Sequence, residues 1–459
     1  MNPDAYSLFS TDTIIALATP SGTGAIGVIR LSGPEALTLV KQVFKGKDLE
    51  KQASHTIHFG TIRDDEAILD EVLASIFIAP HSYTKENVVE ISTHGSAYII
   101  ESIIKLLVRK GARPANPGEF TLRAFLNGKM DLSQAEAVAD LIASDSKASH
   151  QMAIQQMRGG FSNELQHLRD QLIHFAAMIE LELDFGEEDV EFANRDDLKG
   201  LIYQINRVLQ KLISSFELGN VMKNGVPVVI AGKPNVGKST LLNALLNEER
   251  AIVSEIPGTT RDTIEDEMNI RGINFRFIDT AGIRDTEDII EAMGVERTHE
   301  KIRLAKLIIY LVDPEQDMED IHKQIAYLND LQIPYLALVN KMDLLTGSLK
   351  SSLADLDLVY ISALNKEGIE ELKEHILNKV NLQKINADDV LVSNIRHLEA
   401  LQKTQESLNR VLENIGNPVT SDFLAMDIKQ ALYYLGLITG QVTTDDLLET
   451  IFSKFCIGK

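Results

Sequence analysis

The chain has 459 residues, of which 44% are hydrophobic, and its 67 acidic against 45 basic residues give a net charge of −22. This length suggests two to four domains, and the charge argues against tight binding of nucleic acid by this chain alone. A single cysteine excludes a disulfide framework. Together with the lack of a long apolar run and of a signal-like start, it predicts a cytoplasmic protein without a membrane span.

Residues 1–125 read as a mixed α/β domain. Short apolar runs at 13–18, 25–31 and 88–92 predict strands, and 98–108 carries the apolar spacing of a helix. The glycine-containing segment 20–24 is interpreted as a turn, because no Gly-Lys-Ser follows it. His94 is interpreted as a structural histidine, because no second histidine or cysteine stands at ligand spacing.

A helical region follows. Asp131 and Gln134 predict a capping box at the start of a helix over 135–142, and a second helix is expected over 165–183. The acidic run 187–189 is interpreted as a solvated turn. Near the end of the chain, 423–437 predicts one apolar helix face, and another is predicted for Ile395, Leu398, Leu401, Leu408, Leu412 and Ile415. We therefore predict one helical domain, 126–222 with 383–459, interrupted by a domain at 223–382.

The inserted domain opens with a phosphate-binding loop. An apolar run at 228–231 leads into GKPNVGKST at 232–240, which has the G-x-x-x-x-G-K-[ST] pattern. Its glycines let backbone N–H groups point at phosphates. We expect Lys238 to neutralise β- and γ-phosphate charge and Ser239 to bind Mg²⁺.

Four further motifs follow in the order that a Ras-like GTPase requires. Thr260, in the polar loop 257–262, is expected to be a second Mg²⁺ ligand, and Asp279 begins a DTAG motif after a predicted strand. The motif NKMD at 340–343 would read guanine, because the Asp343 carboxylate accepts two hydrogen bonds that adenine cannot donate. The fourth motif is SAL at 362–364, whose backbone N–H groups would contact the guanine oxygen. The predicted nucleotide-binding residues from these motifs are Asn235, Val236, Gly237, Lys238, Ser239, Thr240, Thr260, Asp279, Thr280, Ala281, Gly282, Asn340, Lys341, Asp343, Ser362 and Ala363.

The catalytic residue of Ras-type enzymes is missing. Ile283 stands where they carry a water-orienting glutamine. An isoleucine cannot orient water, so another group must do so. Most of the carboxylates between 284 and 297 are interpreted as a solvated helix face.

The phosphate loop, the segments 258–262 and 279–284, and the C-terminal CIGK (456–459) resemble the MnmE (TrmE) family of potassium-activated GTPases of tRNA wobble-uridine modification. The resemblance implies that Asn235 binds K⁺ with Ser254, Ile256 and Thr259, and it adds Ser254 and Thr259 to the nucleotide contacts. It further implies that Glu291 is catalytic, and that the protein is a homodimer whose G domains associate when K⁺ binds.

The same resemblance implies a folate-binding domain at the N-terminus. Its ligand would be 5-formyl- or methylene-tetrahydrofolate, contacted by Arg30, Glu90, Lys129 and Lys459. From the residues alone, Arg30 already stands out, because it lies inside an apolar strand where an unpaired charge is costly. Cys456 would lie beside this ligand as a candidate reactive thiol.

The function implied is GTP-dependent addition of a carboxymethylaminomethyl or aminomethyl group to C5 of the wobble uridine in certain tRNAs. An MnmG-like partner that carries FAD would supply much of the tRNA contact. Two alternatives remain open, a GTP-switched ribosome assembly factor and a folate-dependent methyltransferase. The sequence leaves undecided the nitrogen donor (glycine or ammonium), the tRNAs served and the stoichiometry with the partner.

Overall fold

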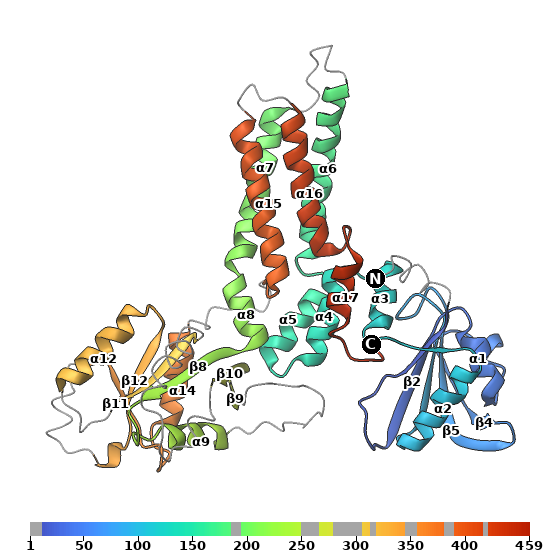
Figure 1. Cartoon of the computed structure of the whole chain (residues 1–459), viewed down its shortest axis with the longest axis horizontal. Coiled ribbons are helices and arrows are strands. Elements are labelled where there is room, and N and C mark those ends of the chain that lie inside the picture. The colour runs from blue at the N-terminus through green and yellow to red at the C-terminus, as the bar shows by residue number, and fades with distance from the viewer. Residues whose placement is uncertain are drawn as a thin grey trace. The chain divides into compact units, whose positions relative to one another are not determined.

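The computed structural model describes residues 12–184, 194–248, 266–278, 305–312, 318–344, 356–380, 390–415 and 421–459 (Figure 1). The chain divides into two compact units, each built from segments far apart in the sequence. The first comprises Met1–Ala139, Gln156–Asn206 and Ala400–Lys459, and the second comprises Asp140–Gln155 and Arg207–Glu399. None of the described helices is long and apolar enough to cross a membrane.

The N-terminal part of the first unit is a seven-stranded sheet with the order β3-β4-β5-β6-β2-β1-β7. Its strands are β1 (Ile14–Leu17), β2 (Ile26–Ser32), β3 (Phe44–Lys45), β4 (Thr56–Asp64), β5 (Ala67–Phe77), β6 (Val88–His94) and β7 (Arg113–Pro114). Two helices, α1 (Ala36–Val43) and α2 (Ala97–Arg109), cover one face of it (Figure 1). The strands and the helix predicted at 13–18, 25–31, 88–92 and 98–108 are thereby confirmed within a residue or two.

The period-two alternation of β2 decides where Arg30 lies. Ile29 and Leu31 point into the core under α1 and α2, so Arg30 points to the opposite face of the sheet. On that face Ile14, Ala16 and Phe120 form a small apolar cluster. Arg30 pairs in register with Ala16 of β1 on one side and with Glu90 of β6 on the other.

The first unit also contains a set of helices. They are α3 (Glu119–Leu126), α4 (Leu132–Ala143), α6 (Ser162–Asp184), α7 (Arg195–Ser214), α15 (Ile395–Asn414), α16 (Ser421–Thr439) and α17 (Asp445–Phe452), of which α4, α7 and α15 continue into the second unit. The predicted capping box is confirmed at α4, where the Asp131 N–H donates to Gln134 Oε1 (2.9 Å) and the Gln134 N–H donates to Asp131 Oδ1 (2.8 Å). The helix predicted at 165–183 is also confirmed, as α6. The acidic run 187–189 lies outside the described residues.

The predicted apolar face of α15 is only partly correct. Leu401, Leu408 and Ile415 are buried, whereas Ile395 is 57% exposed. Thr404 and Ser407 are buried instead, because their hydroxyls donate to the carbonyls of Ala400 (2.7 Å) and Lys403 (2.9 Å) within the helix, which satisfies them without water. Apolar spacing alone therefore misplaces the first turn of this helix.

The second unit contains a six-stranded sheet with the order β13-β12-β11-β8-β10-β9, in which β9 alone is antiparallel to its neighbour. Its strands are β8 (Val226–Gly232), β9 (Asp266–Ile270), β10 (Ile273–Phe277), β11 (Leu307–Val312), β12 (Tyr335–Val339) and β13 (Leu358–Tyr360). Its helices are α5 (Lys147–Met157), α8 (Phe216–Asn224), α9 (Lys238–Glu248), α12 (Met318–Asp330) and α14 (Ile369–Lys379). Separate apolar clusters cover the two faces of the sheet, so this is a doubly covered, mostly parallel sheet of the nucleotide-binding kind.

Asn274 on β10 joins this sheet to the segment between α4 and α5. Its side chain is buried and donates to Asp145 Oδ2 (3.1 Å) and Glu267 Oε2 (3.0 Å). Close by, the Ala148 N–H donates to the carbonyl of Gly272 (3.0 Å). The start of α5 is thus hydrogen-bonded to the β9–β10 hairpin.

Candidate functional site

The phosphate loop follows β8 and ends where α9 begins, as the motif requires. Gly232 and Gly237 have φ of +146° and +97°, in the region that favours glycine. A Cβ at Gly237 would stand 2.2 Å from Asn340 Nδ2, so this position also lacks space. The loop therefore leaves its backbone N–H groups at the N-terminal end of a helix, where anions bind.

Lys238 lies against this loop. Its ammonium donates to the carbonyls of Gly232 (2.9 Å) and Lys233 (2.8 Å), and burial lowers its pKa. Among the described residues, this half-buried ammonium bonds only neutral carbonyls and has no counter-ion. An anion such as a phosphate would supply that charge.

Two segments that follow β12 and β13 meet at the loop. Asn340 is buried; its Nδ2 donates to the Val236 carbonyl (3.1 Å) and its Oδ1 accepts from the Ala363 N–H (3.0 Å). Lys341 donates to the Asn235 carbonyl (3.2 Å), and the Ser362 hydroxyl donates to Asp343 Oδ1 (2.6 Å). Three predicted motifs thus form one hydrogen-bonded group. The sequence did not show that the Asn340 side chain would hydrogen-bond both the phosphate loop and Ala363.

Nine predicted site residues lie outside the described residues. They are Ser254, Ile256, Thr259, Thr260, Asp279, Thr280, Ala281, Gly282 and Glu291. Among the residues that are described, no cluster of three histidine, cysteine or acidic side chains is arranged to hold a metal ion. The Mg²⁺ and K⁺ assignments stay predictions.

The second group of predicted residues lies on the face of the N-terminal sheet where Arg30 points. The Arg30 guanidinium bonds Glu90 Oε1 through both Nε and Nη2, each at 2.8 Å, and its Nη1 donates to the Gly458 carbonyl (3.3 Å). The C-terminal tail is held here, because the Gly118 N–H also bonds the Cys456 carbonyl (3.4 Å). Arg30, Glu90 and the CIGK tail, far apart in the sequence, are therefore neighbours, with Lys459 next to Gly458.

Tyr83 is the residue that the sequence reasoning missed. The guanidinium carbon of Arg30 lies 5.5 Å from the centre of the Tyr83 ring and 5.7 Å from that of Phe120, within cation–π range. The Tyr83 hydroxyl bonds Thr121 Oγ1 (2.8 Å), and burial raises its pKa. Tyr83 also lines a cavity with Lys129. It therefore connects Arg30 to another predicted ligand-binding residue.

A network of charges fixes the start of α3 beneath this site. Arg123 and Glu119, both almost fully buried, bond each other (3.1 Å), and Arg123 also bonds Asp12 (2.5 Å). Arg113 bonds both carboxylates, at 2.5 Å each. Burial alone would raise the pKa of Asp12, but the hydrogen bonds from the two arginines outweigh it, so the pKa lies below its usual value.

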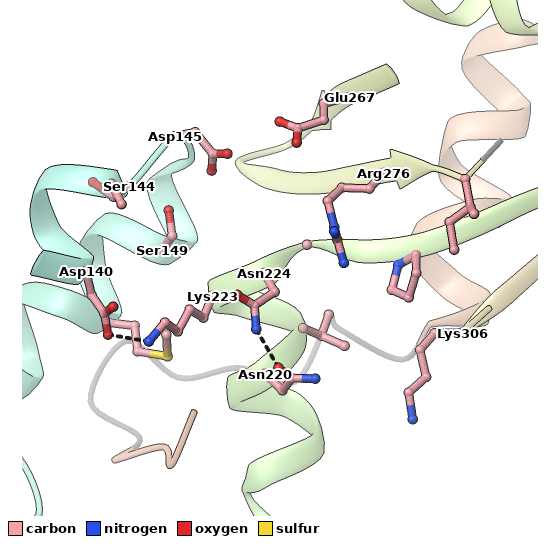
Figure 2. Close-up of a pocket in the computed structure, with 16 residues that line it drawn as sticks. Asp140, Ser144, Asp145, Ser149, Asn220, Lys223, Asn224, Glu267, Arg276 and Lys306 are labelled. Carbon is pink, nitrogen blue, oxygen red and sulfur yellow. Dashed lines mark hydrogen bonds and ion pairs between the residues drawn. The ribbon is translucent and has the colours of Figure 1, made fainter. Parts of the chain in front are cut away.

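Figure 2 shows a different cavity, of about 540 Å³, in the second unit. Asp140 and Lys223 point toward each other there and form an ion pair (2.6 Å). Its charged lining residues are the acidic Asp140, Asp145 and Glu267 and the basic Lys223, Arg276 and Lys306. No residue of the predicted nucleotide or folate sites lines it, and its balanced charge gives no preference for an anion.

Two family models match the chain. The model of the TrmE N-terminus, described as that of a GTP-binding protein, matches residues 13–129, and the model of the MnmE helical domain matches residues 132–456. Three relatives carry the name tRNA modification GTPase MnmE. They come from Cytophaga hutchinsonii (58% identity over 98% of each chain), Christiangramia forsetii (56%, over 98% of this chain and 99% of the relative) and Bacteroides thetaiotaomicron (49%, with the same coverage).

Proposed function

The chain belongs to the MnmE family of tRNA modification GTPases, and from this premise we propose which reaction it serves and how its residues contribute. GTP hydrolysis drives or gates the addition of a carboxymethylaminomethyl or aminomethyl group to C5 of the wobble uridine in certain tRNAs. The observation that carries the proposal is the docking of the CIGK tail on the Arg30–Glu90 pair. A GTP-switched assembly factor has no need of such a second site.

In the nucleotide site, Lys238 binds the β- and γ-phosphates, and Ser239 and Thr260 bind Mg²⁺. Asp343 accepts from the guanine base. The bond from Ser362 to Asp343 Oδ1 supports this, because it fixes the orientation of the carboxylate before the base arrives. Asn340 keeps this motif against the phosphate loop, so that base and phosphates are bound at one fixed separation.

Hydrolysis depends on a cation and a carboxylate that replace the missing glutamine. Asn235, with Ser254, Ile256 and Thr259, binds K⁺ where other GTPases place an arginine finger, and Glu291 positions the attacking water. K⁺ binding accompanies association of the G domains in a homodimer.

The Arg30–Glu90 site binds 5-formyl- or methylene-tetrahydrofolate, a group that supplies a one-carbon unit when bound. The donor set fits: a carboxylate can accept from the amino and ring N–H groups of a pterin, and Tyr83 and Phe120 offer aromatic surface. Lys129 and Lys459 complete the contacts. Cys456 is exposed, and its thiol is a candidate participant in the reaction.

The remaining parts of the proposal concern partners and organisation. An MnmG-like protein with FAD supplies most of the tRNA contact, since a chain of net charge −22 binds tRNA weakly. The chain acts in the cytoplasm. Its domains are 1–125, 126–222 with 383–459, and 223–382.

The experiment is mass spectrometry of nucleosides from tRNA of cells that lack the gene, complemented with the wild type, Lys238→Ala or Glu90→Gln. We expect the C5-modified wobble uridine to disappear without the gene and to return only with the wild type. Intact modification in the deletion strain would refute the proposal and favour the assembly factor, for which ribosome profiles are the assay.

A further inference from the structure

A second cavity, of about 520 Å³, lies in the N-terminal part of the first unit and is lined by Tyr83 and Lys129. Its volume is within the range of about 300–1,000 Å³ that small-molecule sites have. Its lining comes from the turn before β4, from the end of β5 with the loop that follows it, and from the turn after α3. The lining residues are His55, Phe77, His81, Ser82, Tyr83 and Lys129.

The lining of this cavity lacks acidic residues, in contrast to the acidic composition of the whole chain. None of its lining residues is acidic, although acidic residues outnumber basic ones by 67 to 45 in the sequence. Among the described residues, none hydrogen-bonds or ion-pairs with the side chains of His81 and Lys129. A lysine ammonium and two imidazoles, each able to donate an N–H, are thus gathered without a carboxylate, and such a set binds an anion.

Hydrogen bonds hold the segments that line the cavity in place. The Asn127 side chain donates to the Thr84 carbonyl (2.7 Å), and the Lys85 ammonium donates to the Gly128 carbonyl (2.7 Å), so the turn that carries Lys129 is tied to the loop after β5. On the far side, His55 stacks edge-on against Phe77, with 5.4 Å between ring centroids.

Tyr83 is shared by the cavity and the surroundings of Arg30 in the proposed folate site. The Arg30 guanidinium carbon lies over the Tyr83 ring, and Tyr83 also lines the cavity. A ligand bound by its ring system at Arg30 and Glu90 would therefore extend past Tyr83 toward Lys129. In a folate, the part that extends away from the rings is a chain of glutamates, which carries one carboxylate per γ-linked residue and one at its end.

We propose that His55, His81 and Lys129 form a subsite for the γ-linked polyglutamate chain of the folate, so that the protein selects polyglutamylated folates over the monoglutamate. This inference rests on the proposed folate function and names the form of the ligand that the same site takes. Lys129 contacts the first glutamate, which both forms of the ligand carry. His55 and His81 contact only the added glutamates, so they are the specificity residues.

The test compares 5-formyltetrahydrofolate carrying one glutamate with the same compound carrying three, by isothermal titration of the full-length protein at low salt. We expect the triglutamate to bind about tenfold more tightly, since a hydrogen bond from each imidazole to an added carboxylate contributes roughly 0.5–1 kcal/mol. The difference should shrink as salt is raised.

The variant is His55→Phe with His81→Phe, which keeps two aromatic rings and removes the donors. We expect it to bind the two compounds equally, with the affinity of the wild type for the monoglutamate. His167→Phe, an exposed histidine on α6, is the matched control and should leave the tenfold difference unchanged.

Two results would overturn the inference alone: equal affinity of the wild type for both compounds, or a difference that persists in the double variant. Loss of tRNA affinity in the double variant, with folate discrimination intact, would also overturn it and assign the cavity to phosphate. Failure of both compounds to bind the wild type would instead refute the folate function itself.

Discussion

Gly458 in the C-terminal tail offers a sharp test of the second site. Its φ is +95°, and a Cβ built there would lie 2.2 Å from the Leu17 carbonyl oxygen and 3.1 Å from the Ala18 Cα. Both neighbours are backbone atoms of a sheet, which cannot move aside by changing rotamer. In Gly458→Ala, the tail must therefore leave its position on β1.

The size of the effect follows from two contributions. A left-handed backbone costs alanine about 1–2 kcal/mol relative to glycine, and the displaced tail loses the hydrogen bond from Arg30 to the Gly458 carbonyl. Phe452 and Phe455 stay buried, because they precede the tail. We therefore expect the domain to stay folded, with its free energy of unfolding lowered by about 1–2 kcal/mol, while folate affinity falls about tenfold or more.

The assay is titration with 5-formyltetrahydrofolate, alongside thermal unfolding and GTP hydrolysis. Gly111→Ala is the matched control. Its φ is +121°, but the nearest atom to a Cβ is the Leu39 Cδ2 at 3.7 Å, so it carries the backbone cost without the clash. If Gly458→Ala binds folate as the wild type does, the tail plays no part in ligand binding and the reasoning is wrong.

Three further outcomes are expected. Asp343→Asn should lower GTP affinity at least tenfold and raise affinity for xanthosine triphosphate, because the acceptor for the base becomes an amide; competition binding with the two nucleotides measures this. Glu291→Ala should lower kcat by about 10²-fold or more and spare nucleotide affinity, as single-turnover kinetics with a fluorescent nucleotide would show. The lowered pKa of Asp12 adds stability that is present above about pH 4 and is lost as the pH falls through the folded-state value, so wild-type unfolding should be more acid-sensitive than that of Asp12→Asn below about pH 4. An identical pH dependence of unfolding in the two proteins would mean that Arg113 and Arg123 do not hold this carboxyl ionised.

The motif-bearing strands could be predicted closely because their signals are local. The apolar run predicted at 228–231, before the phosphate loop, lies within β8. In a parallel sheet covered on both faces, strands read as continuous apolar segments, and the polar motif begins where burial ends. The capping box at Asp131 was equally predictable, since both of its bonds join residues three positions apart.

The partners of these residues could not be predicted in the same way. Ile395 was placed on a buried face by its spacing but is exposed, whereas Thr404 is buried because its hydroxyl is satisfied inside α15. Tyr83 carries no motif, and its place under Arg30 results from the loop after β5 folding back over the sheet. Such contacts depend on tertiary packing that local patterns do not contain.

The distribution of charge connects the two sites to the composition of the chain. A net charge of −22 disfavours binding of phosphates and carboxylates at long range, yet both proposed ligands, GTP and folate, are anions. Among the described residues, Lys238 bonds only neutral carbonyls in the phosphate loop, and His81 and Lys129 line a cavity without an acidic residue. Because both arrangements act over short distances, local attraction for a small anion is compatible with a net charge that opposes binding of a large polyanion.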